Sequence, residues 1–87
     1  MTRQAIVVGD TLAPHGGRVM TGSQVDAIDG RAAARKDDLV ECAAHGTNPI
    51  AEGDLSTLLD GQPAALEGHH ASCGCVLVSL QKTLSLG

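Results

Sequence analysis

GDLSTLLDGQPAA, at residues 53–65, repeats the pattern of GSQVDAIDGRAAA, at residues 22–34, after a shift of 31 positions. In both copies a glycine opens the stretch, an Asp-Gly pair lies at the same place and two alanines close it. Asp-Gly pairs favour hairpin turns, and Pro63, which takes the place of Ala32, lacks the amide hydrogen that the interior of a helix needs. We therefore predict that both copies are extended, including residues 31–36, where composition alone would favour a helix.

The start of the chain adds a third, partial copy. VGDTLAPHG at residues 8–16 resembles DDLVECAAHG at residues 37–46, and both end in His-Gly. Residues 68–74 form a third corner, in which Cys73 and the next glycine stand near the place of the earlier His-Gly pairs, and the shift of 31 positions places Cys42 on Cys73. Three corners of one type predict pseudo-threefold symmetry, with a metal-binding side chain from each corner converging on one axis.

The composition favours short strands and calls for an additional source of stability. Of the 87 residues, 11 are glycine and none is Phe, Trp or Tyr. A domain of this size gains only about 3–5 kcal/mol from its core, and the aromatic side chains that bury the largest areas are missing. A structural metal ion, a partner subunit or both are therefore expected, because the 3 cysteines cannot all pair within one chain.

Charge and hydropathy argue against several classes of function. The net charge is −4, and without a basic stripe or aromatic rings that stack on bases we expect no binding of nucleic acid. The apolar run at residues 5–8 is too short for a secretory signal. No run reaches the roughly 18–20 residues of a membrane span. We therefore expect a chain made in the cytoplasm, with reduced thiols.

The segment GHHASCGC, residues 68–75, concentrates the side chains that bind metals, because it holds two of the 4 histidines and two of the 3 cysteines. Imidazole and thiolate are preferred ligands of zinc. Side chains alternate along an extended chain, so His69 and Cys73 would share one face while His70 points away. Cys75 would share that face too, but it stays a lesser candidate because the chain can bend at the intervening glycine.

The earlier corners supply the remaining ligand candidates. His15 and His45, each followed by glycine in equivalent corners, complete a set of three histidines and one cysteine with His69 and Cys73. Cys42 is interpreted either as a donor or as a small buried hydrophobe. A closed site with four side-chain donors is structural in character.

The ordered motifs of the chain resemble those of PAAR-domain proteins, the PAAR-repeat family. They are VGD at 8–10, HGG at 15–17, DGRAAAR at 29–35, CAAHG at 42–46, NPIAEG at 48–53, GQPAA at 61–65 and GHHASCG at 68–74. The tetrapeptide that names the family is incomplete in both copies, which read AAAR at 32–35 and PAAL at 63–66. The resemblance covers about residues 5–79 of a single domain, 1–87, and leaves a short tail at 80–87.

The resemblance implies a small, cone-shaped all-β domain of short strands and hairpins, with pseudo-threefold internal repeats around a structural zinc near the tip. It implies one zinc ion held by His15, His45, His69 and Cys73. The implied function is not enzymatic: such a protein caps and sharpens the trimeric VgrG spike of the bacterial type VI secretion system, one copy per trimer, and aids puncture of the target envelope.

The same resemblance implies a partner and a route. Effector proteins are further expected partners, but the tail at 80–87 is too short to fold into an effector, so we expect a stand-alone tip. The protein would assemble in the cytoplasm without a signal peptide. It would then be secreted by the type VI apparatus toward the target cell, without stable insertion into a membrane.

Two other functions are compatible with the residues. A small zinc hydrolase would leave one metal position open and use Glu52 or Glu67 as a base, although the chain has no HExxH pattern. A cytosolic thiol redox module would use Cys73 and Cys75 as an accessible pair. The acidic residues beside the corners are interpreted as turn residues that bond their own backbone, and these are Asp10, Asp37 and Asp38.

The end of the chain is expected to contribute to the broad end of the cone. Val76, Val78 and Leu80 alternate with other residues and so form one apolar strand face. With Leu84 and Leu86, this face is predicted to lie in an apolar base that seats on a trimer. The alternative is that Val76 and Val78 close the core of the domain itself.

Overall fold

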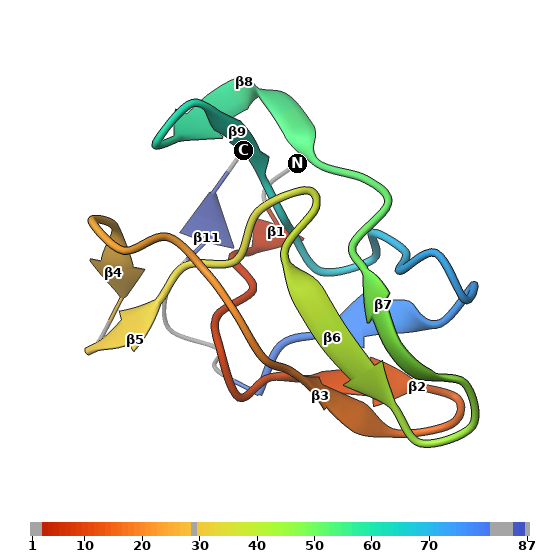
Figure 1. Cartoon of the computed structure of the whole chain (residues 1–87). Coiled ribbons are helices and arrows are strands. Elements are labelled where there is room, and N and C mark those ends of the chain that lie inside the picture. Colours follow the sequence, from red (N-terminus) through yellow and green to blue (C-terminus); the bar gives the residue numbers. More distant parts are fainter. Residues whose placement is uncertain (1–2, 29, 81–84, 87) are drawn as a thin grey trace.

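Short β-strands make up all the regular secondary structure of the residues that the structure describes, which are 3–28, 30–80 and 85–86. In this computed structural model (Figure 1) the strands are β1 (Arg3–Gln4), β2 (Thr11–Ala13), β3 (Gly17–Val19), β4 (Ala27–Ile28), β5 (Arg31–Ala32), β6 (Leu39–Cys42), β7 (Gly46–Pro49), β8 (Asp54–Leu59), β9 (Gln62–Ala64), β10 (Val76–Val78) and β11 (Ser85–Leu86). The all-β fold class predicted from the sequence is thereby confirmed.

Both copies of the repeated segment form antiparallel hairpins. In the second copy β8 pairs with β9, and the connecting Asp60 and Gly61 have φ of 52° and 82°. Positive φ at both central residues is the requirement of a type I′ hairpin turn, which explains the Asp-Gly pair. In the first copy β4 pairs with β5, so residues 31–36 begin as a strand and contain no helix.

The glycine that opens each copy is required by a close approach of the backbone. A Cβ atom on Gly22 would lie 2.8 Å from the carbonyl oxygen of Ala33, and one on Gly53 would lie 2.7 Å from that of Pro63. Contacts under 3.0 Å with backbone atoms cannot be relieved by turning a side chain. The two copies therefore share their packing as well as their sequence pattern.

A closed ring of three hydrogen bonds marks the pseudo-threefold axis. The backbone N–H of Ile6 donates to the carbonyl of Ala65 (3.0 Å), that of Ala65 donates to Ala34 (3.0 Å), and that of Ala34 donates back to Ile6 (2.8 Å). All three residues are fully buried, and each belongs to a different repeat. The predicted threefold repetition therefore exists in the backbone itself.

Each ring residue is followed by a turn of the same construction, at Val7–Asp10, Arg35–Asp38 and Leu66–His69. In each turn the last residue donates its backbone N–H to the carbonyl of the first, at 3.0 Å. The side chain of the last residue accepts the N–H of the first, at 2.9, 2.8 and 3.0 Å in chain order. The third residue has positive φ in every case, at Gly9, Asp37 and Gly68. The acidic residues beside the corners are thus turn residues, as predicted.

The hairpins diverge from this axis in two directions. The β2–β3 and β6–β7 connections approach each other at one corner of the molecule, whereas β4–β5, β8–β9 and the β1–β11 pair spread over the opposite side (Figure 1). β10 pairs with β2, and β3 pairs with β6, so the strands that lead to the narrow end are joined by backbone hydrogen bonds. We call the narrow end the tip and the opposite side the base.

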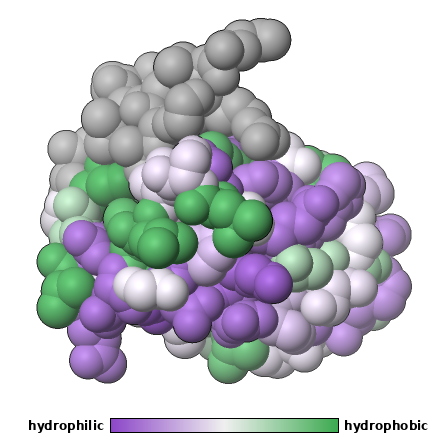
Figure 2. Space-filling model, turned by 90° about the horizontal axis from the view of Figure 1, so that it is seen from above, coloured by the Kyte–Doolittle hydropathy of each residue, from purple (hydrophilic) through white to green (hydrophobic). Residues whose placement is uncertain are grey.

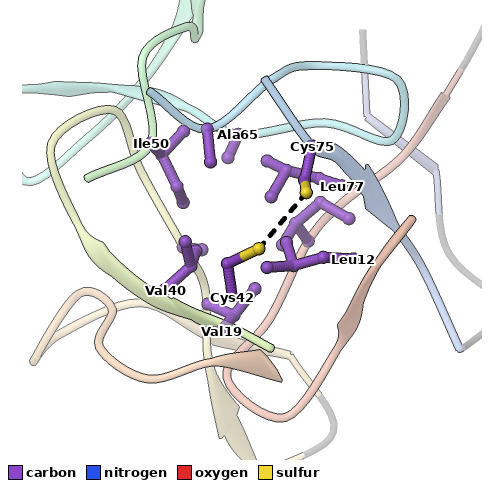
Figure 3. Packing of buried hydrophobic residues seen from close by; sticks show 11 residues of the cluster. Leu12, Val19, Val40, Cys42, Ile50, Ala65, Cys75 and Leu77 are labelled. Atoms are coloured by element: carbon purple, nitrogen blue, oxygen red, sulfur yellow. Dashed lines mark hydrogen bonds between the residues drawn. The ribbon is translucent and has the colours of Figure 1, made fainter. Parts of the chain in front are cut away.

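The core includes the ring residues and consists of aliphatic and sulfur side chains (Figure 3). Its buried members are Ile6, Leu12, Val19, Ala34, Val40, Cys42, Ile50, Ala65, Ala71, Cys75 and Leu77. Two cysteines therefore take places that other small domains give to larger hydrophobic residues. No side-chain nitrogen or oxygen buried among the described residues lacks a hydrogen-bond partner.

The C-terminal segment differs in part from its predicted role. Leu77 is fully buried in the core, while Val76 and Val78 are half-buried in β10. Leu80 is 60% exposed. Leu84 and the side chain of Leu86 lie outside the described residues. The described residues hold no helix long and apolar enough to cross a membrane.

Candidate metal centre

Three loops meet at the tip, and each contains a glycine with left-handed backbone. His15 lies in the β2–β3 connection, His45 in the β6–β7 connection, and Cys73 in the turn before β10. The glycines are Gly16 (φ 83°), Gly46 (φ 76°) and Gly74 (φ 95°), and a Cβ atom on any of them would meet nothing within 4 Å. Glycine is therefore required at these positions by the left-handed backbone conformation, and not by a lack of space for a side chain. The three predicted corners are therefore real.

Hydrogen bonds join the three tip loops to one another. The backbone N–H of Ala43 donates to the carbonyl of Gly16 at 3.1 Å, which connects the first loop to the second. The N–H of Cys73 donates to the side-chain oxygen of Asn48 at 3.1 Å, and the N–H of Ser72 donates to the carbonyl of Pro49 at 2.8 Å. The third loop is thereby fixed to β7, so the donors on different loops keep a defined separation.

Four metal-binding side chains gather in this tip: Cys42, His45, Cys73 and Cys75. Their ligand atoms all lie within 4.8 Å of one another. The Sγ of Cys42 is 3.4 Å from Nδ1 of His45 and 3.4 Å from Sγ of Cys75. Around a tetrahedral zinc ion with Zn–S of about 2.3 Å and Zn–N of about 2.0–2.1 Å, ligand atoms lie about 3.3–3.8 Å apart. Donor type and spacing therefore suit a zinc-like ion, and these four residues form a candidate metal-binding site.

The cluster is open on one side only. Cys42 and Cys75 are 1% exposed and belong to the core, Cys73 is half-buried, and His45 is exposed. A bound ion would therefore have apolar packing beneath it and water on the side of the histidine. Four side-chain donors leave a tetrahedral ion no open position, which is the arrangement of a structural site.

The two core cysteines have opposed acidities. Burial acts to raise the pKa of Cys42, but hydrogen bonds from His45 and from the backbone of Ala44 outweigh it and lower the pKa to about 6. Burial, together with hydrogen bonds to the thiols of Cys42 and Cys73, raises the pKa of Cys75 to about 11. Without an ion, these hydrogen bonds favour the thiolate at Cys42 and the proton at Cys75. Binding of a metal by both must displace that proton.

The structure brings together two members of the ligand set predicted from the sequence, His45 and Cys73. His15 lies beside them: its ring centroid is 5.3 Å from that of His45, and the rings meet edge to face at 72°. His15 is not among the four residues whose ligand atoms lie within 4.8 Å of one another. Its ring packs against that of His45 beside the cluster.

His69 lies outside the cluster. Its Nδ1 accepts the backbone N–H of Leu66 at 3.0 Å, in the turn position that Asp10 and Asp38 occupy in the other repeats. Alternation would place His69 and Cys73 on one face only if the chain between them were extended. In the structure the carbonyl of Ala71 accepts the N–H of Gly74, so residues 71–74 form a turn and the alternation of an extended chain does not apply there.

Cys42 and Cys75 were the less favoured candidates, and each had a signal in the sequence. The shift of 31 positions places Cys42 on Cys73, so equivalent corners carry equivalent thiols. Cys75 follows Gly74, where the chain bends with positive φ. That bend brings Cys75 to the cluster beside Cys73.

The residues that a zinc hydrolase or a thiol redox module would use have other interactions in the structure or an unsuitable environment. Glu52 accepts hydrogen bonds from the backbone and the ring of His70, and Glu67 accepts the N–H of Ser79 at 3.3 Å. Neither carboxylate belongs to the cluster. Of the redox pair, Cys75 is buried and has a raised pKa, which disfavours it as a nucleophile.

Comparison with known proteins places this fold in a family. The sequence model of the PAAR motif matches residues 3–79. A search of curated proteins gave no match. The matched range contains all three repeats, all three tip loops and the whole cluster of metal-binding side chains.

Proposed function

The chain belongs to the PAAR-motif family, and on that premise we propose that it forms the tip of a type VI secretion spike. Membership supports a spike-associated role in general, and a structural role in place of an enzymatic one. The proposal goes further: the protein caps and sharpens a VgrG trimer, aids puncture of the target envelope, and leaves the cell with the spike. Effector proteins are proposed as further partners of the same assembly.

The observation that carries the proposal is the closed ring of Ile6, Ala34 and Ala65. A single chain whose backbone repeats three times around one axis presents three similar sides to a partner. A trimer with a threefold axis has the same property, so the two axes coincide when one chain sits on the end of one trimer. This symmetry match supports one copy per trimer.

The base offers the apolar surface that such a contact needs. Six large hydrophobic side chains are exposed on the described part of the molecule: Met20, Val25, Leu39, Leu55, Leu58 and Leu80. Leu55 is 80% exposed although it lies in β8. Viewed from the side of β8 and β9, hydrophobic residues gather in groups on the surface (Figure 2). We propose that this surface seats on the trimer.

The proposed metal is one zinc ion, held by Cys42, His45, Cys73 and Cys75. Zinc bound by four side chains supplies a cross-link and not a catalytic water. Here the cross-link would join the second and third tip loops, and His15 from the first loop would pack over it. A force applied at the tip would then act on loops that the ion holds together, instead of on loops that can move separately.

The proposal is tested by mixing the purified chain with the VgrG trimer encoded in the same genome and measuring the mass of the complex. One chain per trimer is expected. The double variant Leu55→Lys/Leu58→Lys should lose the complex, because it places two charges in the apolar contact. The matched control is Thr47→Lys, which adds a charge to an exposed position of β7 opposite Glu41. A complex that tolerates the double variant, or no complex with the unaltered chain, would refute the proposal.

A further inference from the structure

Two cysteine sulfurs in the tip lie almost within bonding distance. The Sγ atoms of Cys42 and Cys75 are 3.4 Å apart, and a disulfide has an S–S distance of about 2.05 Å. An approach of about 1.4 Å would therefore join them. Both side chains are 1% exposed and face each other across the core, as the dashed line in Figure 3 shows.

The connection made by such a bond is the same one that the metal would make. Cys42 ends β6 and belongs to the second tip loop, whereas Cys75 precedes β10 and belongs to the third. The pair is separated by 33 residues in sequence. Cys73 and Cys75 are separated by one glycine, so a bond between them would close a small, strained ring and would connect a loop only to itself.

Of the three thiols, that of Cys73 is the one that an oxidant in solution can reach. Cys73 is half-buried, while Cys42 and Cys75 are closed off from solvent. The ligand atoms of all three lie within 4.8 Å of one another, so a sulfur bound to an external group at Cys73 remains within reach of both buried sulfurs. Thiol exchange requires this proximity.

We propose that Cys42 and Cys75 are a disulfide site, oxidised by a small-molecule disulfide once the tip has left the reducing cytoplasm. This inference rests on the proposed function for the change of compartment. The thiolate of Cys73 attacks the oxidant and forms a mixed disulfide, releasing one small thiol. Cys42 then attacks the Cys73 sulfur and displaces the second small thiol.

In the last step the sulfur of Cys75, which is a thiolate as long as it is a ligand of the ion, attacks the sulfur of Cys42, and Cys73 leaves as a thiolate. The oxidant gains two electrons and two protons and becomes two thiols, while two protein thiols become one disulfide. Because the ion loses two of its four donors, it is released. The bond then holds together the two loops that the ion held before.

The experiment uses the zinc-loaded full chain and glutathione disulfide. The released zinc is followed with a coloured chelator and the remaining thiols are titrated. The expected result is loss of two of the 3 thiols, loss of the zinc in the same proportion, and recovery of both after reduction with added zinc. Cleavage after glutamate separates residues 42–52 from residues 68–87, and fragmentation of the joined peptides identifies the bonded cysteine.

Two variants separate the proposed pair from the alternatives. Cys73→Ser should end with the same Cys42–Cys75 bond but form it more slowly, because the most accessible of the three thiols is missing. Cys75→Ser should stop at a bond between Cys42 and Cys73, because the thiol that displaces Cys73 from Cys42 is missing. Retention of zinc with all thiols free, or a bond between Cys73 and Cys75, would overturn the inference. Failure to bind VgrG would instead count against the proposed function alone, because the oxidation assay contains no partner.

Discussion

The three turns beside the ring and the three loops at the tip are both threefold repeats, but they tolerate sequence change in different ways. In the turns, Asp10, Asp38 and His69 perform one task, which is to accept a backbone N–H at about 3 Å. In the tip, the second and third loops place different donors at different depths around one point, and the first loop places His15 beside them. A repeat that needs only an acceptor can exchange carboxylate for imidazole, whereas a repeat that converges on an ion cannot exchange its donors freely.

This difference explains why a histidine in a metal-rich segment need not be a ligand. His69 lies in the same eight residues as Cys73 and Cys75, yet its Nδ1 serves the turn of Leu66. Position within the repeat, and not distance along the chain, decides which role a residue has. Experiments that treat turns and tip loops separately should therefore give separate results.

Removal of the metal should have the largest effect, and it should act on the tip. Stabilisation by a ligand present at a thousand times its Kd is about 4 kcal/mol, which corresponds to a fall of about 15–30 °C in melting temperature for a domain of this size. A strong chelator with calorimetry measures the fall. Amide hydrogen exchange should quicken first at the tip loops and last at Ile6, Ala34 and Ala65. An unchanged melting temperature would mean that the cluster contributes no metal-linked stability.

Loss of a turn acceptor should have the next largest effect, and it should leave the metal in place. Asp10 is fully buried and accepts the N–H groups of Val7 (2.9 Å) and Leu80 (3.1 Å). Asp10→Ala would leave both donors without this acceptor, at a cost of about 2–4 kcal/mol. Denaturant unfolding measures the cost. Glu41→Ala, which removes an exposed carboxylate 3.8 Å from Arg18, is the control and should cost less than about 0.5 kcal/mol.

The smallest effect concerns His70, the neighbour of His69 that belongs to neither repeat class. Hydrogen bonds from the ring and backbone of His70 hold the pKa of Glu52 below its ordinary value. A lowered pKa stabilises the folded state above the ordinary pKa of about 4.5, and this contribution disappears as the pH falls through the lowered value. Because both side chains are 50% exposed, it should stay below about 1 kcal/mol.

Glu52→Gln isolates this contribution. The variant should be slightly less stable than the unaltered chain at pH 6, and the difference should vanish at a pH below the folded-state pKa. Urea unfolding at a series of pH values gives the comparison. A difference that grows toward acid would mean that the carboxylate is destabilising in its ionised form.

Much of the fold follows from local rules that can be applied to the sequence and that the structure obeys. The Asp-Gly pair at Asp60 and Gly61 determined a hairpin because positive φ is needed twice, and Pro63 correctly argued against a helix. The shift of 31 positions pairs Cys42 with Cys73, and both lie in the cluster, although Cys42 ends β6 in the core and Cys73 is half-buried in a turn. These rules concern only a few neighbouring residues, so they can be applied without knowledge of the tertiary structure.

The site was predicted only in part, because convergence of loops is not a local property. His45 and Cys73 were identified from their corners, and both lie in the cluster. The choice of His69 over Cys75 depended on whether residues 69–75 stay extended. The hydrogen bond from Gly74 to Ala71, which closes the turn there, has no signature in the sequence beyond the glycine itself.

The central claim is that the metal belongs to the tip loops and not to the turns, and the zinc content of two variants tests it most directly. His69→Asp makes the third turn like the other two, so the folded protein should keep one zinc ion per chain by elemental analysis. Cys42→Ser removes a tip donor and should lose the ion under the same conditions. Loss of zinc from His69→Asp with full retention in Cys42→Ser would contradict the account.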